Sequence, residues 1–373
     1  MADIAVHGGA FWDAIGADFG DLRRADEIIN ADVLDAWFPP DPAIVARLTE
    51  HLDWLMRTSP PTRCEGLLAA ISETRGVLPA CVTAGPGSSS LIFAAFRQWF
   101  SGVRALALRP TYGEYAHVLD HVLGSKVDAF DLHREEGYRV DIEALARAAA
   151  GYDLLVLVNP NSPTGGFLPR TEVVKLLDLL PETVAVWIDE TYLEYAGSPN
   201  GWSAESLETE VARRPNLMVL KSMSKVYALS GLRIGYLIAP AERTAELQRQ
   251  TPPWAVDLPA QVAAIMALRD SEYYPARWRE TATLRNQMVE HLVGLGWEVA
   301  PSSANFVLAD VRTSDLETER IAQAMMERGI FVRAFPEGQE ELRRYGLRLA
   351  VKDAATQSRL LSVLTEVVKS PKG

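Results

Sequence analysis

The sequence has few cysteines, no long apolar run and no tract of basic residues, and each absence excludes a class of protein. Only two cysteines, Cys64 and Cys81, occur among 373 residues. Their positions match neither the spacing of a metal site nor that of a redox pair, so we expect buried structural thiols, no bound metal and a cytoplasmic location. No apolar run reaches the ~18 residues that a membrane helix needs. The N-terminus lacks the basic start and apolar stretch of a secretory signal.

Positive charge is also scarce. The chain has 37 Lys and Arg residues against 49 Asp and Glu residues, which gives a formal net charge of −12. Such an acidic chain is a poor partner for nucleic acid or for an anionic membrane. Any anion that it binds must therefore be held by a few arginines and backbone amides at one place. Hydrophobic residues make up 48% of the chain, which predicts a soluble protein with a well-filled core.

The order of apolar segments predicts an α/β fold. Between about residues 65 and 270, short apolar strands alternate with amphipathic helices, which is typical of a mostly parallel sheet covered by helices on both faces. Beyond residue 270, one long amphipathic helix is followed by short strands and two further helices, at 315–328 and 354–368. We expect an irregular N-terminal segment (1–60) that packs on both domains, a large domain (61–275) and a small α+β C-terminal domain (276–373).

Polar clusters follow several of the predicted strands, and ligands of such sheets bind at the carboxyl ends of strands. The stretch "TAGPGSSSLIF" (83–93) has a glycine turn and three serines that open a helix, which suits an anion but also an ordinary helix cap. The stretch "VNPNSPTGGF" (158–167) is rich in common turn residues. The stretch "WIDETYLEY" (187–195) places two acids and a tyrosine at a strand end. The stretch "LKSMSKVYALSGLRIGY" (220–236) places Lys225 just after an apolar strand, where a solvated charge is unusual.

Taken together and in this order, these motifs resemble those of the fold-type I pyridoxal-phosphate enzymes of the class I/II aminotransferase group. The resemblance covers nearly the whole chain, and within the group it is nearest to histidinol-phosphate aminotransferase and threonine-phosphate decarboxylase. "SMSKVYALSGLRIGY", "NPNSPTG" and "DETYLEY" are similar to the lysine, Asn-Pro and Asp-x-x-Tyr motifs of that group. "PTYGEY" is similar to a loop of both relatives, and "HGGAFWDAIG" to the opening of the decarboxylase.

The resemblance implies pyridoxal 5'-phosphate as the cofactor and gives roles to particular residues. Lys225 would form the Schiff base with the cofactor aldehyde and then carry a proton between Cα and C4'. Asp189 would keep the pyridinium nitrogen protonated, and Tyr192 would bond the ring's 3'-oxygen. Tyr112 would stack on the ring. The phosphate would be held by Gly87, Ser88, Ser89, Ser222, Ser224 and Arg233.

The resemblance also implies how the substrate is held. Arg348, inside the strand "YGLRLAV", would clamp the α-carboxylate with two parallel hydrogen bonds. Arg333 lies where these relatives hold a distal phosphate, and His7 belongs to the His-Gly-Gly opening. Each arginine taken alone could equally face water from an alternating strand.

Three departures from the family pattern concern the ring and the substrate. The asparagine that usually precedes Pro-Thr-Gly is replaced by Ser162, with Asn161 one residue earlier, so either side chain could reach the ring oxygen. A tyrosine that usually lies near residue 59 and reaches the partner subunit's cofactor is replaced by Ser59. The segment "INADVLDAWFPP" differs from the substrate-facing loop of the relatives. These changes predict a substrate other than the usual one.

We therefore predict an aminotransferase that acts on an α-amino acid, with or without a distal polar or anionic group, and on a keto-acid acceptor, as a homodimer. A decarboxylase and an elimination or cyclisation lyase are alternatives on the same fold. They differ in which bond of Cα lies perpendicular to the cofactor ring, which one sequence does not reveal. A regulator that borrows this fold would need an added DNA-binding domain, for which the chain has no room.

Overall fold

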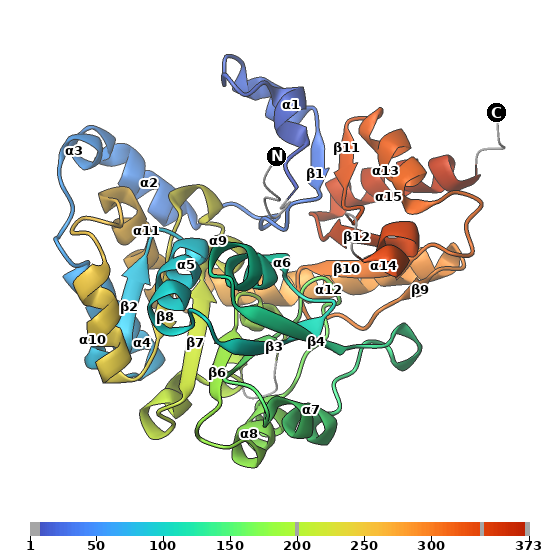
Figure 1. The fold of residues 1–373 in the computed structure, drawn as a ribbon. Helices are drawn as coiled ribbons and strands as arrows, with labels where there is room; N and C mark the ends of the chain where they lie inside the picture. Colours follow the sequence, from blue (N-terminus) through green and yellow to red (C-terminus); the bar gives the residue numbers. More distant parts are fainter. Residues whose placement is uncertain (1–7, 198–200, 336–338, 370–373) are drawn as a thin grey trace.

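The computed structural model of the protein describes residues 8–197, 201–335 and 339–369. A seven-stranded sheet forms the centre of the larger part, in the order β2-β8-β7-β6-β5-β3-β4 (Figure 1). Strand β8 runs antiparallel to its neighbours β2 and β7, and the other pairings are parallel. The prediction of a mostly parallel α/β sheet is confirmed. The strands are β2 Val82–Gly85, β3 Arg104–Arg109, β4 Lys126–Asp131, β5 Leu154–Val158, β6 Ala185–Asp189, β7 Leu217–Ser222 and β8 Gly235–Ile238.

Helices cover both faces of this sheet because alternate strand residues point to opposite sides and nearly all of them are apolar. Leu155 and Leu157 of β5 join one core cluster, whereas Leu154 and Val156 join another. The first cluster includes residues of α4, α7, α8 and α11, and the second includes residues of α5 and α10. These helices are α4 Glu65–Arg75, α5 Ser88–Trp99, α7 Ile142–Ala149, α8 Arg170–Leu179, α10 Ala241–Gln250 and α11 Leu258–Arg269, with short α6 Gly113–Ala116 and α9 Met223–Val226.

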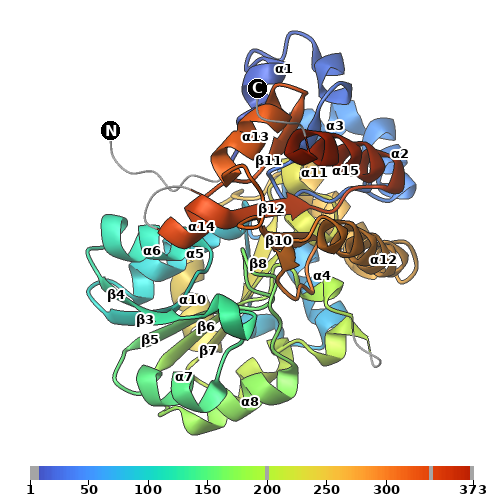
Figure 2. The same cartoon turned by 90° about the vertical axis from the view of Figure 1, so that its right-hand side faces the viewer.

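The C-terminal part contains a second, antiparallel sheet in the order β12-β10-β9, which lies above the large sheet in Figure 2. It comprises β9 Glu298–Val299, β10 Phe306–Asp310 and β12 Gly346–Ala350, and β11 Ile330–Val332 lies beside it. The helices of this part are α12 Tyr273–Gly294, α13 Thr318–Met326, α14 Glu340–Tyr345 and α15 Ala354–Lys369. Short helical turns connect the elements: Leu22–Asp26, Pro79–Cys81, His117–Val122, Arg134–Glu136, Leu193–Tyr195, Trp202–Ala204, Glu208–Arg213 and Ser230–Leu232.

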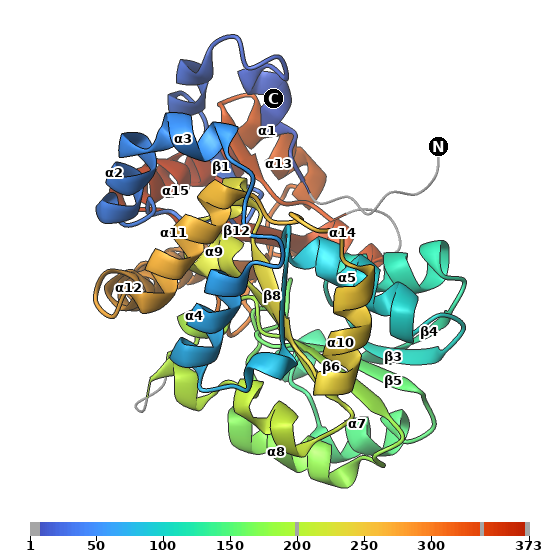
Figure 3. The same ribbon diagram turned by 90° about the vertical axis from the view of Figure 1, so that its left-hand side faces the viewer.

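The N-terminal segment bridges the two parts. Its strand β1 Ile29–Ala31 pairs in parallel with β11, and α2 Pro42–Glu50 and α3 Leu52–Arg57 pack beside α11 (Figure 3). A further helix, α1, spans Phe11–Ile15. The prediction that this segment is irregular is wrong over residues 42–57. Asp41 accepts a hydrogen bond from the Ala43 amide and Pro42 occupies the first turn, so a proline that suggested irregularity instead starts a helix. The boundaries at residues 60 and 275 stay predictions.

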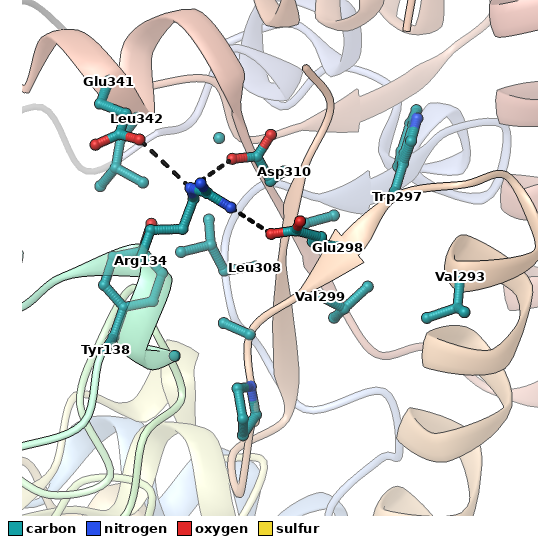
Figure 4. A pocket seen from close by; sticks show the side chains of 15 residues that line it. Arg134, Tyr138, Val293, Trp297, Glu298, Val299, Leu308, Asp310, Glu341 and Leu342 are labelled. Atoms are coloured by element: carbon teal, nitrogen blue, oxygen red, sulfur yellow. Dashed lines mark hydrogen bonds and ion pairs between the residues drawn. The ribbon is translucent and has the colours of Figure 1, made fainter. Parts of the chain in front are cut away.

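One arginine ties the two parts together at the rim of a surface pocket (Figure 4). Arg134, from the turn after β4, bonds the carboxylate of Glu298, and its Nε lies 3.7 Å from Asp310 and 3.6 Å from Glu341. All three carboxylates belong to the C-terminal part. This cluster therefore fixes the small sheet against the large domain. Within the described ranges, no helix is long and apolar enough to cross a membrane.

Candidate active site

A pocket opens at the carboxyl ends of β5, β6 and β7, where the N-terminal segment and β12 also arrive. Eleven of the residues that the sequence predicts for the site line it, together with Val33, Leu34, Val158 and Thr191. The eleven are Ser88, Ser89, Tyr112, Ser162, Asp189, Tyr192, Ser222, Ser224, Lys225, Arg233 and Arg348. The fold thus brings together side chains that are 260 residues apart in the chain, from Ser88 to Arg348.

Lys225 points to a carboxylate of the N-terminal segment. Strand β7 ends at Ser222, whose hydroxyl caps the short helix α9 by accepting from the Ser224 amide. Lys225 follows on that helix, and its Nζ lies 2.8 Å from Oδ1 of Asp35. Ser230 donates to the same oxygen at 2.7 Å. Burial opposes the charge of Asp35, but these two partners prevail and its pKa is lowered. Sequence reasoning missed Asp35, although it flagged the segment that carries it.

Asp189, the last residue of β6, is buried and its carboxylate is held from two sides. The amide and hydroxyl of Thr191 donate to Oδ1, at 2.9 and 2.6 Å, and the Tyr115 hydroxyl donates to Oδ2 at 2.7 Å. Trp187 in turn donates to the Tyr115 oxygen at 2.9 Å. Burial raises the pKa of Asp189. Among the described residues it forms no ion pair, so a ligand N–H that is positively charged would be its natural partner.

Donors to an anion converge at the start of α5. Ser88 and Ser89 form its first turn, where free amides and the helix dipole favour negative charge. Gly87 precedes them with φ 87°, and a Cβ on it would lie 2.6 Å from Nη2 of Arg233. Nη1 of Arg233 lies 3.3 Å from the Ser224 hydroxyl. Glycine is thus required where the guanidinium approaches the helix start. Ser88, Ser89, Ser224 and Arg233 together form a cradle that suits a phosphate.

Tyr112 is fixed by a carboxylate that the sequence did not single out. Its hydroxyl donates to Oε2 of Glu114 at 2.9 Å, and the Ser89 hydroxyl donates to the same atom at 3.0 Å. Burial, reinforced by Glu114, raises the pKa of Tyr112. Both Glu114 and Tyr115 belong to the "PTYGEY" loop, so the motif was visible although these two roles were not.

Arg348 reaches the pocket from β12 instead of facing water. It donates to the Ser162 hydroxyl at 3.3 Å and to the Asp32 carbonyl at 3.0 Å, while its Nε is buried without a partner among the described residues. Burial lowers the pKa of Arg348 to about 10. A buried guanidinium with an unmatched N–H suits a carboxylate ligand. Ser162, and not Asn161, lines the pocket, because the Asn161 amide donates to the Pro110 carbonyl after β3 and to the Thr164 hydroxyl of its own turn.

Several predicted residues lie elsewhere. Arg333 is outside the pocket lining, and its Nη1 lies 3.5 Å from Oδ1 of Asp32. His7 lies outside the described residues. Ser59 is exposed after α3 and does not line this pocket. Within the part of the chain that the structure describes, no group of three His, Cys, Asp or Glu side chains could hold a metal.

Tyr192 completes the floor of the pocket. It is nearly fully buried, packs edge-on against Phe306 of β10 with ring centroids 5.3 Å apart, and burial raises the pKa of its hydroxyl. Its position beside Asp189 agrees with a predicted contact to the ring oxygen, which stays a prediction.

Comparisons with known proteins connect this geometry to one family. The family described as aminotransferase class I and II matches residues 67–364. Histidinol-phosphate aminotransferase 2 of Ralstonia nicotianae is 33% identical over 322 residues, covering 86% of this chain and 84% of that protein. Aromatic amino acid aminotransferase of Cutibacterium acnes is 30% identical over 334 residues, covering 89% and 90%.

Two solved structures share the fold. Histidinol-phosphate aminotransferase of Sinorhizobium meliloti, in complex with pyridoxal-5'-phosphate, has a TM-score of 0.82 at 23% identity, covering 92% of this chain and 91% of that one. L-threonine-O-3-phosphate decarboxylase of Porphyromonas gingivalis has a TM-score of 0.77 at 22% identity, covering 92% and 100%. Because a transferase and a decarboxylase score alike, the backbone alone does not separate the two reactions.

Proposed function

The chain belongs to the aminotransferase class I and II family, and we propose that it transfers the amino group of an α-amino acid to a keto acid in the pocket around Lys225. The protein is a pyridoxal-phosphate-dependent aminotransferase of fold type I, so the predicted family, fold class and cofactor are confirmed. The main support for this proposal is that Lys225, Asp189 and Arg348 line the same pocket.

The residues of the pocket fit the polar parts of pyridoxal phosphate. The cradle of Ser88, Ser89, Ser224 and Arg233 suits the phosphate, because it combines a helix start with one guanidinium. The buried carboxylate of Asp189 suits the protonated ring nitrogen. When bound, this cofactor supplies an electron sink that stabilises a carbanion at Cα of the substrate.

Side chains of this protein would form the covalent link, move the proton and orient the substrate. Lys225 provides the amine for the covalent link and then moves a proton at Cα. Tyr115 and Thr191 hold the carboxylate of Asp189 in one orientation, in which it would accept a hydrogen bond from the protonated ring nitrogen. Arg348 fixes the α-carboxylate, which decides which bond of Cα is cleaved.

Borohydride reduction followed by peptide mapping tests the covalent role. The cofactor mass should appear on the peptide that contains Lys225, and its fragments should separate Lys225 from Lys221, four residues earlier. A Lys225→Ala variant should carry no label, while a Lys175→Ala variant, changed on the exposed surface, should label as the parent does. A label on Lys221 or on another lysine would overturn the proposal.

We also propose a homodimer, a cytoplasmic location and the division into a segment to residue 60 and domains at 61–275 and 276–373. Cys64 and Cys81 are buried free thiols, which fits a reducing compartment. Helix α3 exposes Trp54 and Met56, at 50% and 75% of their surface, just before Ser59. Large apolar side chains exposed this far suit a contact with a second copy.

A further inference from the structure

The N-terminal segment brings one carboxylate to Lys225, which lines the pocket, and another to Arg333, which does not. Asp32 and Asp35 flank Val33 and Leu34, and both of those apolar residues line the pocket. Asp32 is buried, accepts from the Gly9 amide at 3.0 Å and lies 3.5 Å from Arg333. Asp35 is paired with Lys225 at 2.8 Å. Thus one short segment places negative charge beside two of the cations that an anionic substrate would need.

Arg333 is consequently ill suited to a distal anion. A phosphate or carboxylate at the end of the substrate would have to compete with Asp32 for this guanidinium. Asp35 adds a second negative charge beside Lys225, and its pKa is lowered, so it is ionised at neutral pH. Like charges brought together in a partly closed site disfavour binding. Arg348 can still bind the α-carboxylate of the substrate, because its buried Nε has no hydrogen-bond partner among the described residues.

Asp35 is suited to bind a cationic group of the substrate instead. Its partner Lys225 is the residue that the proposed function commits to the cofactor, and a lysine held there no longer offers its full charge to Asp35. Asp35 does not itself line the pocket, but its neighbour Leu34 and its partner Lys225 do, and its side chain is 39% exposed, so a cation at that end of the pocket can reach it. Lys352 also acts on Asp35, but only through longer-range attraction. A half-buried carboxylate that loses its ion-pair partner binds a replacement cation favourably.

We propose that the substrate is an α-amino acid whose side chain ends in an ammonium or guanidinium group, received by Asp35 while Arg348 holds the α-carboxylate. This inference rests on the proposed function, because it assumes that Lys225 carries the cofactor. It names a substrate class opposite in charge to the phosphorylated compound in the names of the relatives.

Matched amino donors test the charge directly in the cofactor-loaded protein. L-Arginine and L-citrulline have nearly the same shape and differ in charge, and L-ornithine and L-norvaline form a second pair. The charged member of at least one pair should have the larger kcat/KM by roughly tenfold or more, as expected for a charge-assisted contact. L-Glutamate and L-histidinol phosphate should react more slowly than the neutral donors.

Two variants test whether Asp35 causes the preference for a charged substrate. In Asp35→Asn, the arginine-to-citrulline ratio of kcat/KM should fall towards one. Asp13→Asn makes the same change on the exposed face of α1 in the same N-terminal segment, and should leave that ratio as it was. If Asp35→Asn and the parent show the same ratio, Asp35 does not receive the substrate.

Binding of unreactive analogues gives a second readout. The analogues 5-guanidinopentanoate and hexanoate lack the α-amine, so calorimetry with the loaded protein reports binding alone. The guanidino acid should bind roughly tenfold more tightly, and this preference should be lost in Asp35→Asn. Amino acids that react without any preference for charge would overturn this inference and leave the proposed function intact. If no amino acid reacts, the proposed function fails, and the analogues still decide whether Asp35 selects a cation.

Discussion

Two lysines at the end of β7 show how environment, and not residue type, assigns a role. Lys221 is buried, and its Nζ lies 3.0 Å from Glu194 and 3.5 Å from Glu190. Lys225 comes four residues later, on α9, is 20% exposed and lines the pocket. The first lysine is paired with buried acids, and the second has its amine in the pocket, where the proposed function needs it.

Changing Asp189 to asparagine should lower turnover by several orders of magnitude while leaving part of the cofactor binding. In the proposed function the carboxylate acts electronically, since a neutral amide would not keep the ring nitrogen protonated. Steady-state rates and the cofactor dissociation constant check this. Asp178→Asn, on the exposed end of α8, is the control. Near-normal turnover, with a stability change within ~0.5 kcal/mol, would mean that Asp189 is an ordinary strand-end acid.

Arg348 should be needed for every amino-acid substrate, because its buried guanidinium has an unmatched N–H in the pocket. Arg348→Ala should raise the activation barrier for kcat/KM by ~2–4 kcal/mol, and Arg348→Lys should recover little, because an ammonium does not form two parallel bonds. Arg344→Lys, on the exposed side of α14, is the matched control. A loss of less than about tenfold in Arg348→Ala, roughly 1.4 kcal/mol, would place the carboxylate clamp elsewhere.

At the scale of elements, β6 and β7 are joined behind the site by a buried charge cluster. Lys221 of β7 meets Glu190 and Glu194, which follow β6, and their attraction raises the pKa of Lys221 despite burial. Because Asp189 immediately precedes Glu190, this cluster also fixes the end of the strand that carries Asp189.

Removing Lys221 should therefore destabilise the fold. Lys221→Met leaves two buried carboxylates without their cation, and we expect the free energy of unfolding to fall by ~3–5 kcal/mol. Lys175→Met, which breaks the exposed pair with Glu143, should cost less than ~1 kcal/mol. Denaturant unfolding of both variants measures the difference. Equal effects would show that the buried cluster contributes no more than a surface pair.

The strands of the large sheet could be predicted from the sequence, whereas contacts between distant segments could not. Strands such as β5 and β6 were predictable because apolar residues run through both faces, and the polar residues at their ends marked the site. Asp35 was not predictable, because it meets Lys225 only after a segment 190 positions away folds over the pocket. Tyr115 was hidden for a similar reason: its contact with Asp189 joins positions 74 residues apart.

For the whole molecule, the exposed apolar side chains of α3 lead us to expect a dimer of twice the 41.1 kDa chain mass. Trp54→Glu combined with Met56→Glu should shift the mass in light scattering towards the single chain, since it buries charge at the contact. Leu179→Glu, which alters an equally exposed apolar side chain on α8, should leave the mass unchanged. A dimer that survives the double change would place the contact on another face.

Transamination is tested most directly by a single turnover of the cofactor-loaded protein with an amino donor and no acceptor. An aminotransferase must release keto acid before any acceptor is present, and it retains the amino group on the enzyme. We expect about one equivalent of keto acid per Lys225 site, no carbon dioxide, and no further product until a keto acid is added. Carbon dioxide, or continued turnover without an acceptor, would contradict this expectation and establish a decarboxylase or lyase on this fold.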